Sequence, residues 1–145
     1  MSVIVGVDGS AGSRAAIRLA AQEAGYRDAK LVAVMAYNSD RALGAPAARP
    51  LATLRTTDDE RSIAESSLRD ALKAALGDRA GDVDMRVVVG LAGRRLVDAA
   101  REASAELIVL AARGTMSLFL RTVSQYVLRN APCPVLVVPD ASKDR

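Results

Sequence analysis

The stretch LIVLAARGTMSLFLRTVSQYVLRNAPCPVLVVP, Leu107 to Pro139, decides the fold. It begins with a short apolar run, continues through a loop and a segment with helical spacing, and ends on a second apolar run. Both runs are apolar at successive positions instead of alternating, which is typical of strands buried on both faces of a parallel sheet. The order also places hydroxyl side chains near the start of a helix, where proteins often hold phosphate. The stretch therefore predicts an α/β domain and raises the question of phosphate binding.

The rest of the chain repeats this alternation. Five short apolar runs rich in Val and Ile predict five strands, and four segments with apolar residues three and four positions apart predict four helices. We therefore expect a three-layer α/β/α domain with an open parallel sheet between helices. The expected strands are 2–8, 30–37, 83–90, 106–112 and 134–139, and the expected helices include residues 16–24, 57–76, 96–103 and 117–130.

Turn-forming residues mark where these elements end. Gly25 and Gly77 are the expected stops of the first two helices, and residues 57–60, TDDE, have the spacing of a capping box. Residues 38–57 contain one glycine and two prolines without a steady period, which predicts a long loop. Gly90 to Gly93 is interpreted as a strand-to-helix turn, followed by a solvated face at Arg94 and Arg95.

Length and hydropathy limit the organisation of the chain. Its 145 residues suffice for one domain with a proper core and are too few for two, so we assign 1–145 to one domain with an ordered core of about 2–139. No apolar run approaches the length of a membrane span, and no basic region precedes the first apolar run. We therefore expect a cytoplasmic protein without membrane contact.

Composition excludes several classes of function. The chain contains no histidine, so a Ser-His-Asp triad, a Cys-His pair and imidazole metal ligands are excluded. Cys133 is the single cysteine, which excludes an internal disulfide; we interpret it as a small core residue rather than a nucleophile. The net charge of +3 is spread along the chain, and one Phe, three Tyr and no Trp supply few stacking platforms, so nucleic acid is not expected as a partner.

The expected fold also places the candidate site. In open parallel sheets ligands bind beyond the carboxyl ends of the strands, where the strand order reverses. If the first strand is central, the site is formed by the turn Asp8-Gly9-Ser10 and by the loop from Arg113 to Ser117, which follows the fourth strand.

Three segments resemble the universal stress protein family over nearly the whole length. They are VIVGVDGS at the start, VVVGLAGRRLVDAA in the middle, and LIVLAARG followed by TVSQYVLRNAPCPVLVVP at the end. The resemblance implies an adenine nucleotide alpha hydrolase-like fold, with a five-stranded parallel sheet of order 3-2-1-4-5. It also implies a homodimer through the final strand.

The family has an ATP-binding branch with the pattern Gly, two residues, Gly, nine residues, then Gly followed by Ser or Thr. The glycines let backbone amides approach phosphates, and the hydroxyl lies at a helix N-terminus, which favours anions. On this chain the first position falls on Ala111, the second on Gly114, and the final pair on Arg121-Thr122. Only six residues separate Gly114 from Arg121, so the loop is three residues shorter, up to roughly 10 Å of extended chain.

Arg121, where the binding branch has glycine, admits two interpretations. Its guanidinium could pair with a phosphate in place of backbone amides. Alternatively it fills the space for the phosphates, and the short loop brings Leu118 and Phe119 toward it. We favour the second interpretation, because a shortened loop cannot surround a triphosphate with amides.

The other site positions are assigned by the resemblance. Asp8 matches the family's acidic residue near the ribose and adenine, and Ala36 matches the position whose backbone faces the adenine; Asp8 is explained equally well as a turn former. Thr122 and Ser124 either bind phosphate or satisfy backbone groups in the first turns of a helix. The full set of candidate nucleotide-binding residues is Asp8, Gly9, Ser10, Ala36, Gly114, Arg121, Thr122, Val123 and Ser124.

These observations favour a non-enzymatic universal stress protein that acts in a stress response through protein contacts, with nucleotide binding weakened or lost. The alternative is a switch that binds ATP or another adenine nucleotide. A nucleotide hydrolase is the least favoured, because no base for water is evident beyond Asp8. No catalytic residue and no metal site are expected, and ATP is the one cofactor that the resemblance makes possible.

Overall fold

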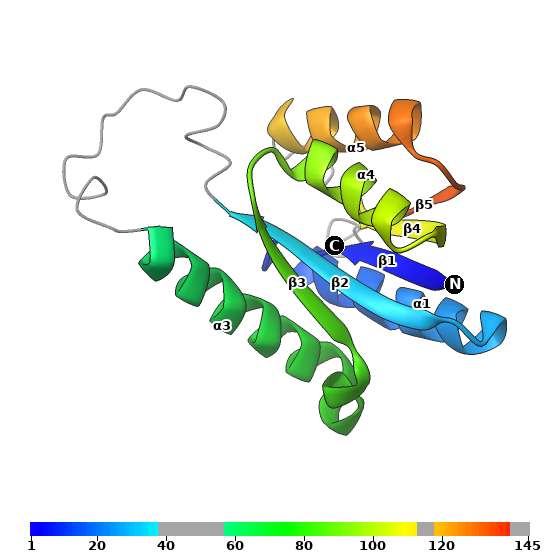
Figure 1. The fold of residues 1–145 in the computed structure, drawn as a ribbon. Coiled ribbons are helices and arrows are strands. Elements are labelled where there is room, and N and C mark those ends of the chain that lie inside the picture. Colours follow the sequence, from blue (N-terminus) through cyan, green and yellow to red (C-terminus); the bar gives the residue numbers. More distant parts are fainter. Residues whose placement is uncertain (38–56, 113–117, 140–145) are drawn as a thin grey trace.

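The computed structural model describes residues 1–37, 57–112 and 118–139, which form a five-stranded sheet between two layers of helices (Figure 1). All four strand pairs are parallel, and the order is β3-β2-β1-β4-β5. This confirms the predicted fold class and strand order. The strands are β1 (Ser2–Gly6), β2 (Lys30–Tyr37), β3 (Asp84–Val89), β4 (Ala105–Ala111) and β5 (Val135–Val138).

The helices lie on both faces of this sheet. In Figure 1, α4 and α5 cover one face and α1 and α3 the other, so that β1 lies in the middle layer. A 3-10 helix, η2 (Gly77–Asp82), connects α3 to β3. None of the described helices is long and apolar enough to cross a bilayer. The α-helices are α1 (Ala11–Arg27), α3 (Thr57–Leu76), α4 (Ala92–Glu102) and α5 (Leu118–Asn130).

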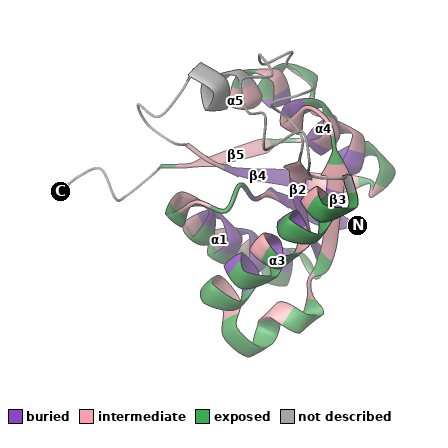
Figure 2. Ribbon diagram, turned by 90° about the vertical axis from the view of Figure 1, so that its left-hand side faces the viewer, coloured by how far each residue is buried: buried purple, intermediate pink, exposed green. Residues whose placement is uncertain are grey.

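Two hydrophobic clusters, one on each face of the sheet, explain why the strands are apolar at successive positions. Side chains along a strand point alternately to opposite faces. In β1, Val3 and Val5 join the cluster with α1 and α3, whereas Ile4 joins the cluster with α4 and α5. Figure 2 shows buried residues in the sheet and exposed residues on the outer surfaces of α1 and α3. Both faces of the sheet must therefore be apolar.

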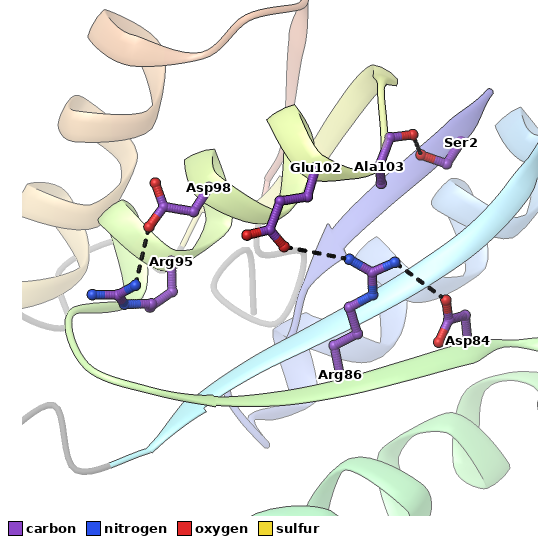
Figure 3. A network of polar contacts seen from close by, with 7 residues as sticks. All are labelled: Ser2, Asp84, Arg86, Arg95, Asp98, Glu102 and Ala103. Carbon is purple, nitrogen blue, oxygen red and sulfur yellow. Dashed lines mark hydrogen bonds and ion pairs between the residues drawn. The ribbon is translucent and has the colours of Figure 1, made fainter.

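The two strands at the ends of the sheet differ in character. β5 consists of Val135, Leu136, Val137 and Val138, all half-buried. β3 carries Asp84 and Arg86, and Arg86 reaches two carboxylates: Asp84 at 3.5 Å and Glu102 of α4 at 3.9 Å (Figure 3). One end of the sheet is thus uncharged, and the other carries a small ionic network.

The first helix ends later than the sequence predicts. Gly25 lies inside α1, which continues to Arg27, so the expected stop at Gly25 is wrong. The helix ends instead at Asp28, whose φ of 51° is left-handed and whose N–H donates to the carbonyls of Ala24 and Gly25. Aspartate tolerates this conformation better than most residues with a side chain, so it can replace the usual glycine.

Other predicted boundaries agree with the structure. Gly77, with a φ of 60°, directly follows the last residue of α3 and confirms the expected stop. α3 begins at Thr57, the first residue of the predicted capping box, although the contacts of this side chain lie outside the described residues. Most of the predicted long loop, residues 38–56, also lies outside them.

Gly90 and Leu91 form the predicted turn between β3 and α4, but the Arg95 side chain is only partly solvated. Gly90 adopts a φ of 127°, and a Cβ added there would lie 2.9 Å from Nε of Arg95. The Arg95 side chain therefore packs over the turn, and its guanidinium donates to Asp98 at 3.1 Å. Only Arg94 is exposed as expected.

Candidate functional site

The turn after β1 presents a carboxylate in a fixed orientation at the carboxyl end of the sheet. One oxygen of Asp8, Oδ1, accepts hydrogen bonds from the hydroxyls of Ser10 and Ser13, each at 2.6 Å, and from the Ser10 amide at 2.9 Å. The Asp8 amide in turn donates to the Ser13 hydroxyl at 3.1 Å. The turn-forming interpretation of Asp8 is therefore correct, and it coexists with a place at the site.

Gly9 is required by the backbone of this turn. Its φ is 84°, and a Cβ added there would lie 3.1 Å from the hydroxyl oxygen of Ser67 in α3. A side chain would be strained by the backbone conformation and also crowded by α3. Gly9 thus lets α3 pack closely against the turn that holds Asp8.

A cavity of about 220 Å³ opens beside Asp8, between the carboxyl ends of β1, β2 and β4. It lies where the strand order reverses, between β1 and β4, as the sequence predicts. Asp8 is the only charged residue among the described residues that line it, and Ser13 and Ser124 add hydroxyls. The other described lining residues are apolar or glycine: Gly6, Val7, Val34, Met35, Ala36, Ala92, Leu96, Leu110, Ala111 and Val123.

The depth of this cavity depends on Gly6, the last residue of β1. A Cβ added to Gly6 would lie 2.8 Å from Leu110 and 3.0 Å from Leu96, measured to their terminal methyl carbons. Both leucines belong to the hydrophobic cluster under α4 and α5. The absent side chain lets these leucines meet the strand and form the inner wall of the cavity.

The chain matches the universal stress protein family model over residues 1–139. The chain belongs to this family. The match includes every strand of the sheet and both sides of the cavity.

Individual relatives support the assignment. A universal stress protein of Mycobacterium tuberculosis is 34% identical over 140 residues, which are 94% of this chain and 47% of that protein. The chain thus spans about half the length of the curated relatives it matches. A solved universal stress protein in complex with cAMP is 29% identical, with a TM-score of 0.63 over 95% of each chain. A family member from Burkholderia pseudomallei is 30% identical, with a TM-score of 0.66 over 96% of each chain.

In this universal stress protein, the start of α5 limits which backbone groups near Thr122 and Val123 could contact a phosphate. The helix starts at Leu118, so both residues lie beyond its first four positions. Amides at such positions donate within the helix, to carbonyls four residues earlier. The backbone at 122–124 therefore offers no free N–H groups to a phosphate, and Ser124 can contribute only its hydroxyl.

The structure brings together part of the predicted site. Asp8, Ala36, Val123 and Ser124 all line the cavity. Gly9 and Ser10 do not line it and act instead through the turn that orients Asp8. Gly114 lies outside the described residues, as do the side chains of Arg121 and Thr122, so their predicted roles stay predictions.

Sequence reasoning missed Ser13. Its side chain is 1% exposed, lines the cavity and exchanges two hydrogen bonds with Asp8. The available signal was a pair of hydroxyls three positions apart, Ser10 and Ser13, directly after an acidic residue at a helix start. That spacing places both on one side of the first turn.

Cys133 lies away from the cavity, in the connection between α5 and β5. It is half-buried and packs against the cluster under α4 and α5, so it is a peripheral part of the core rather than a fully buried residue. Burial raises the pKa of its thiol. The thiolate, which is the reactive form, is therefore disfavoured, in agreement with a structural role. In the described part of the chain, acidic and thiol side chains form no cluster of three that could hold a metal ion.

Proposed function

We propose that this chain is a non-enzymatic stress-response protein whose cavity accepts the nucleoside part of an adenine nucleotide but holds the phosphates weakly. The observation that carries the proposal is the cavity itself. It is lined by an oriented carboxylate, by the β2 position predicted to face adenine, and by few other polar groups. A small, largely apolar cavity with a few directed polar atoms suits a base and its sugar.

A solved relative supports a nucleotide as the ligand. The universal stress protein in complex with cAMP shares 29% of its sequence with this chain and superposes over nearly the whole fold. A cyclic monophosphate carries one phosphate charge and no triphosphate tail. Such a ligand needs little of the extended loop that the ATP-binding branch supplies.

Weak phosphate binding is supported by sequence and structure together. The segment between Gly114 and Arg121 is three residues shorter than in the ATP-binding pattern, and Arg121 replaces the final glycine of that pattern. The α5 amides that follow Arg121 are positioned to donate within the helix. Neither the shortened segment nor these α5 amides are therefore suited to surround a triphosphate.

We also propose that the protein acts through contacts with other proteins rather than through catalysis. Hydrolysis needs a base that activates water, and the chain contains no histidine. Among the described cavity residues, Asp8 is the single titratable group. The first expected contact is with a second copy of the chain through β5, an uncharged strand at the end of the sheet.

Titration calorimetry and ligand-detected NMR with adenosine, cAMP and ATP test the nucleotide proposal. We expect adenosine and cAMP to bind, and ATP to bind no more tightly than roughly the millimolar range, about 4 kcal/mol. Arg121→Gly alone should improve ATP binding little, because it frees space without adding amides. Arg121→Gly combined with a Gly-rich insertion of three residues between Thr115 and Leu120 should improve it clearly more.

Arg129→Gly serves as the control, because it removes an arginine of the same helix that does not line the cavity and also costs helix propensity. It should leave all three affinities unchanged. Micromolar ATP binding by the wild type, lost in Arg121→Gly, contradicts the proposal and makes Arg121 a phosphate clamp. A wild type that binds none of the three ligands contradicts the nucleotide part altogether.

A further inference from the structure

Ser2 and Ser13 are the two buried polar side chains of the described part of the chain. Ser2, 4% exposed, donates to the carbonyl of Ala103 at 3.0 Å and connects β1 to the end of α4 (Figure 3). Ser13 lies at the other end of β1 and lines the cavity. A buried hydroxyl costs free energy unless it is hydrogen-bonded. Both serines form hydrogen bonds, but only Ser13 bonds to a residue that also lines the cavity, Asp8.

Ser13 and Asp8 exchange two hydrogen bonds. The Ser13 hydroxyl donates to Oδ1 of Asp8 at 2.6 Å and accepts from the Asp8 amide at 3.1 Å, so its proton is committed to the carboxylate. The donor lies on a buried helical turn and not on a mobile surface chain. Ser10, on the outer side of the turn, donates to the same oxygen. These contacts fix the rotation of the Asp8 carboxyl group.

We propose that Ser13 is a positioning residue, which holds the Asp8 carboxylate toward the cavity and thereby selects ligands that offer it a hydrogen-bond donor. The inference rests on the proposed nucleoside-binding function. Asp8 is the one charged group among the described lining residues, and an ionised carboxylate only accepts hydrogen bonds. A ligand that offers a donor adds a charge-assisted hydrogen bond to those that Asp8 already accepts, and a ligand that lacks the donor forgoes that bond.

Adenosine has three candidate donors: the 2′-hydroxyl, the 3′-hydroxyl and the amino group of the base. The test therefore compares adenosine with 2′-deoxyadenosine, 3′-deoxyadenosine and inosine, each of which lacks one of them. We expect the wild type to bind one of these analogues roughly tenfold more weakly than adenosine, as expected for one lost bond to a charged group. In Ser13→Ala this ratio should fall to within about twofold, because, of the hydrogen bonds described above, only those from the hydroxyl and amide of Ser10, on the outer side of the turn, still hold the carboxylate, and its direction toward the cavity is lost.

Ser2→Ala is the matched control. It also removes one buried serine hydroxyl, which makes one hydrogen bond, and it lies at the end of β1 away from the cavity. A merely structural effect of losing a buried serine should appear in both variants. We expect Ser2→Ala to keep the wild-type ratio between the analogues, even if it lowers the unfolding temperature as much as Ser13→Ala does. Equal loss of selectivity in both variants overturns the proposal, as does a wild-type ratio in Ser13→Ala.

Ligand-free crystal structures of the wild type and Ser13→Ala separate this proposal from the nucleoside proposal. We expect the Asp8 carboxyl group to rotate or become poorly ordered in the variant while the sheet stays unchanged. An Asp8 carboxyl group that keeps its position overturns the positioning role whatever binds. Absence of binding of every nucleoside to the wild type, with a rotated Asp8 in the variant, instead contradicts the proposed function and leaves Ser13 as the residue that orients Asp8.

Discussion

At the scale of single residues, Gly6 shows how an absent side chain shapes the cavity. It ends β1 directly below the turn of Asp8, and Leu96 and Leu110 occupy the space that a Cβ would need. The two leucines are nearly fully buried and belong to one packed cluster. Both also line the cavity, so they can make room for a Cβ only by turning into the cavity or by displacing their packed neighbours.

Gly6→Ala should therefore lower the free energy of unfolding by roughly 1 to 3 kcal/mol through overpacking. Gly25→Ala is the natural comparison, because Gly25 lies in α1 with no atom within 4 Å of an added Cβ. That substitution should raise stability by up to about 1 kcal/mol, since alanine favours helices over glycine. Urea unfolding of both variants measures the two effects. Equal stability of wild type and Gly6→Ala would show that the leucines yield easily.

Residue types revealed part of the site before its geometry was known. Asp8 was predicted because it follows an apolar run, and such ends meet at one edge of a parallel sheet. Ala36 was assigned only by the resemblance to universal stress proteins. Ser13 and Arg95 were not predicted, since their roles depend on where a side chain points. Ser13 turns inward to Asp8 and Arg95 folds back over Gly90, and sequence spacing fixes neither direction.

At the scale of elements, the ends of helices carry the largest differences from expectation. Strand positions were predictable because burial on both faces demands continuous apolar runs, a strong signal. Helix ends depend on a single left-handed residue. Gly77 fulfils this role at α3, but Asp28 takes it at α1 and leaves Gly25 inside the helix. A glycine marks a permitted end and not a required one.

The two helix ends, one formed by Asp28 and the other by Gly77, predict opposite effects of a substitution on stability. Asp28→Gly should stabilise the protein by about 0.5 to 1 kcal/mol, because glycine adopts a positive φ without a Cβ penalty. Gly77→Ala should destabilise it by about 1 kcal/mol, although space for the methyl group is available. The denaturant midpoints of both variants, compared with the wild type, give the two signs. A shift in the same direction for both would mean that backbone strain does not decide these helix ends.

At the scale of the whole molecule, the two edge strands of the sheet differ in how readily they can pair with a strand of another copy. Edge strands offer unpaired backbone groups, and charged side chains on such a strand discourage pairing. β3 carries Asp84 and Arg86 with its link to Glu102, whereas β5 is uncharged. Pairing of two copies is therefore expected at β5 and not at β3.

Val137 allows a direct test of this pairing. It is half-buried and is not among the described side chains that pack against either hydrophobic cluster. Val137→Lys should convert a dimer into monomers in sedimentation velocity, while Val137→Thr, which keeps β-branching, should leave the dimer largely intact. A wild type that stays monomeric at every concentration contradicts the dimer, and a Val137→Lys dimer as tight as the wild type places the contact elsewhere.

The ionic network on β3 also affects which assemblies the protein can form. A filament built by adding β5 of one copy to β3 of the next would never close, and it would grow without limit. Such growth would desolvate Arg86 and the carboxylates of Asp84 and Glu102. A two-fold dimer through β5 leaves these groups in water and pairs both uncharged strands. We therefore expect the charges on β3 to disfavour edge-to-edge polymerisation in concentrated protein.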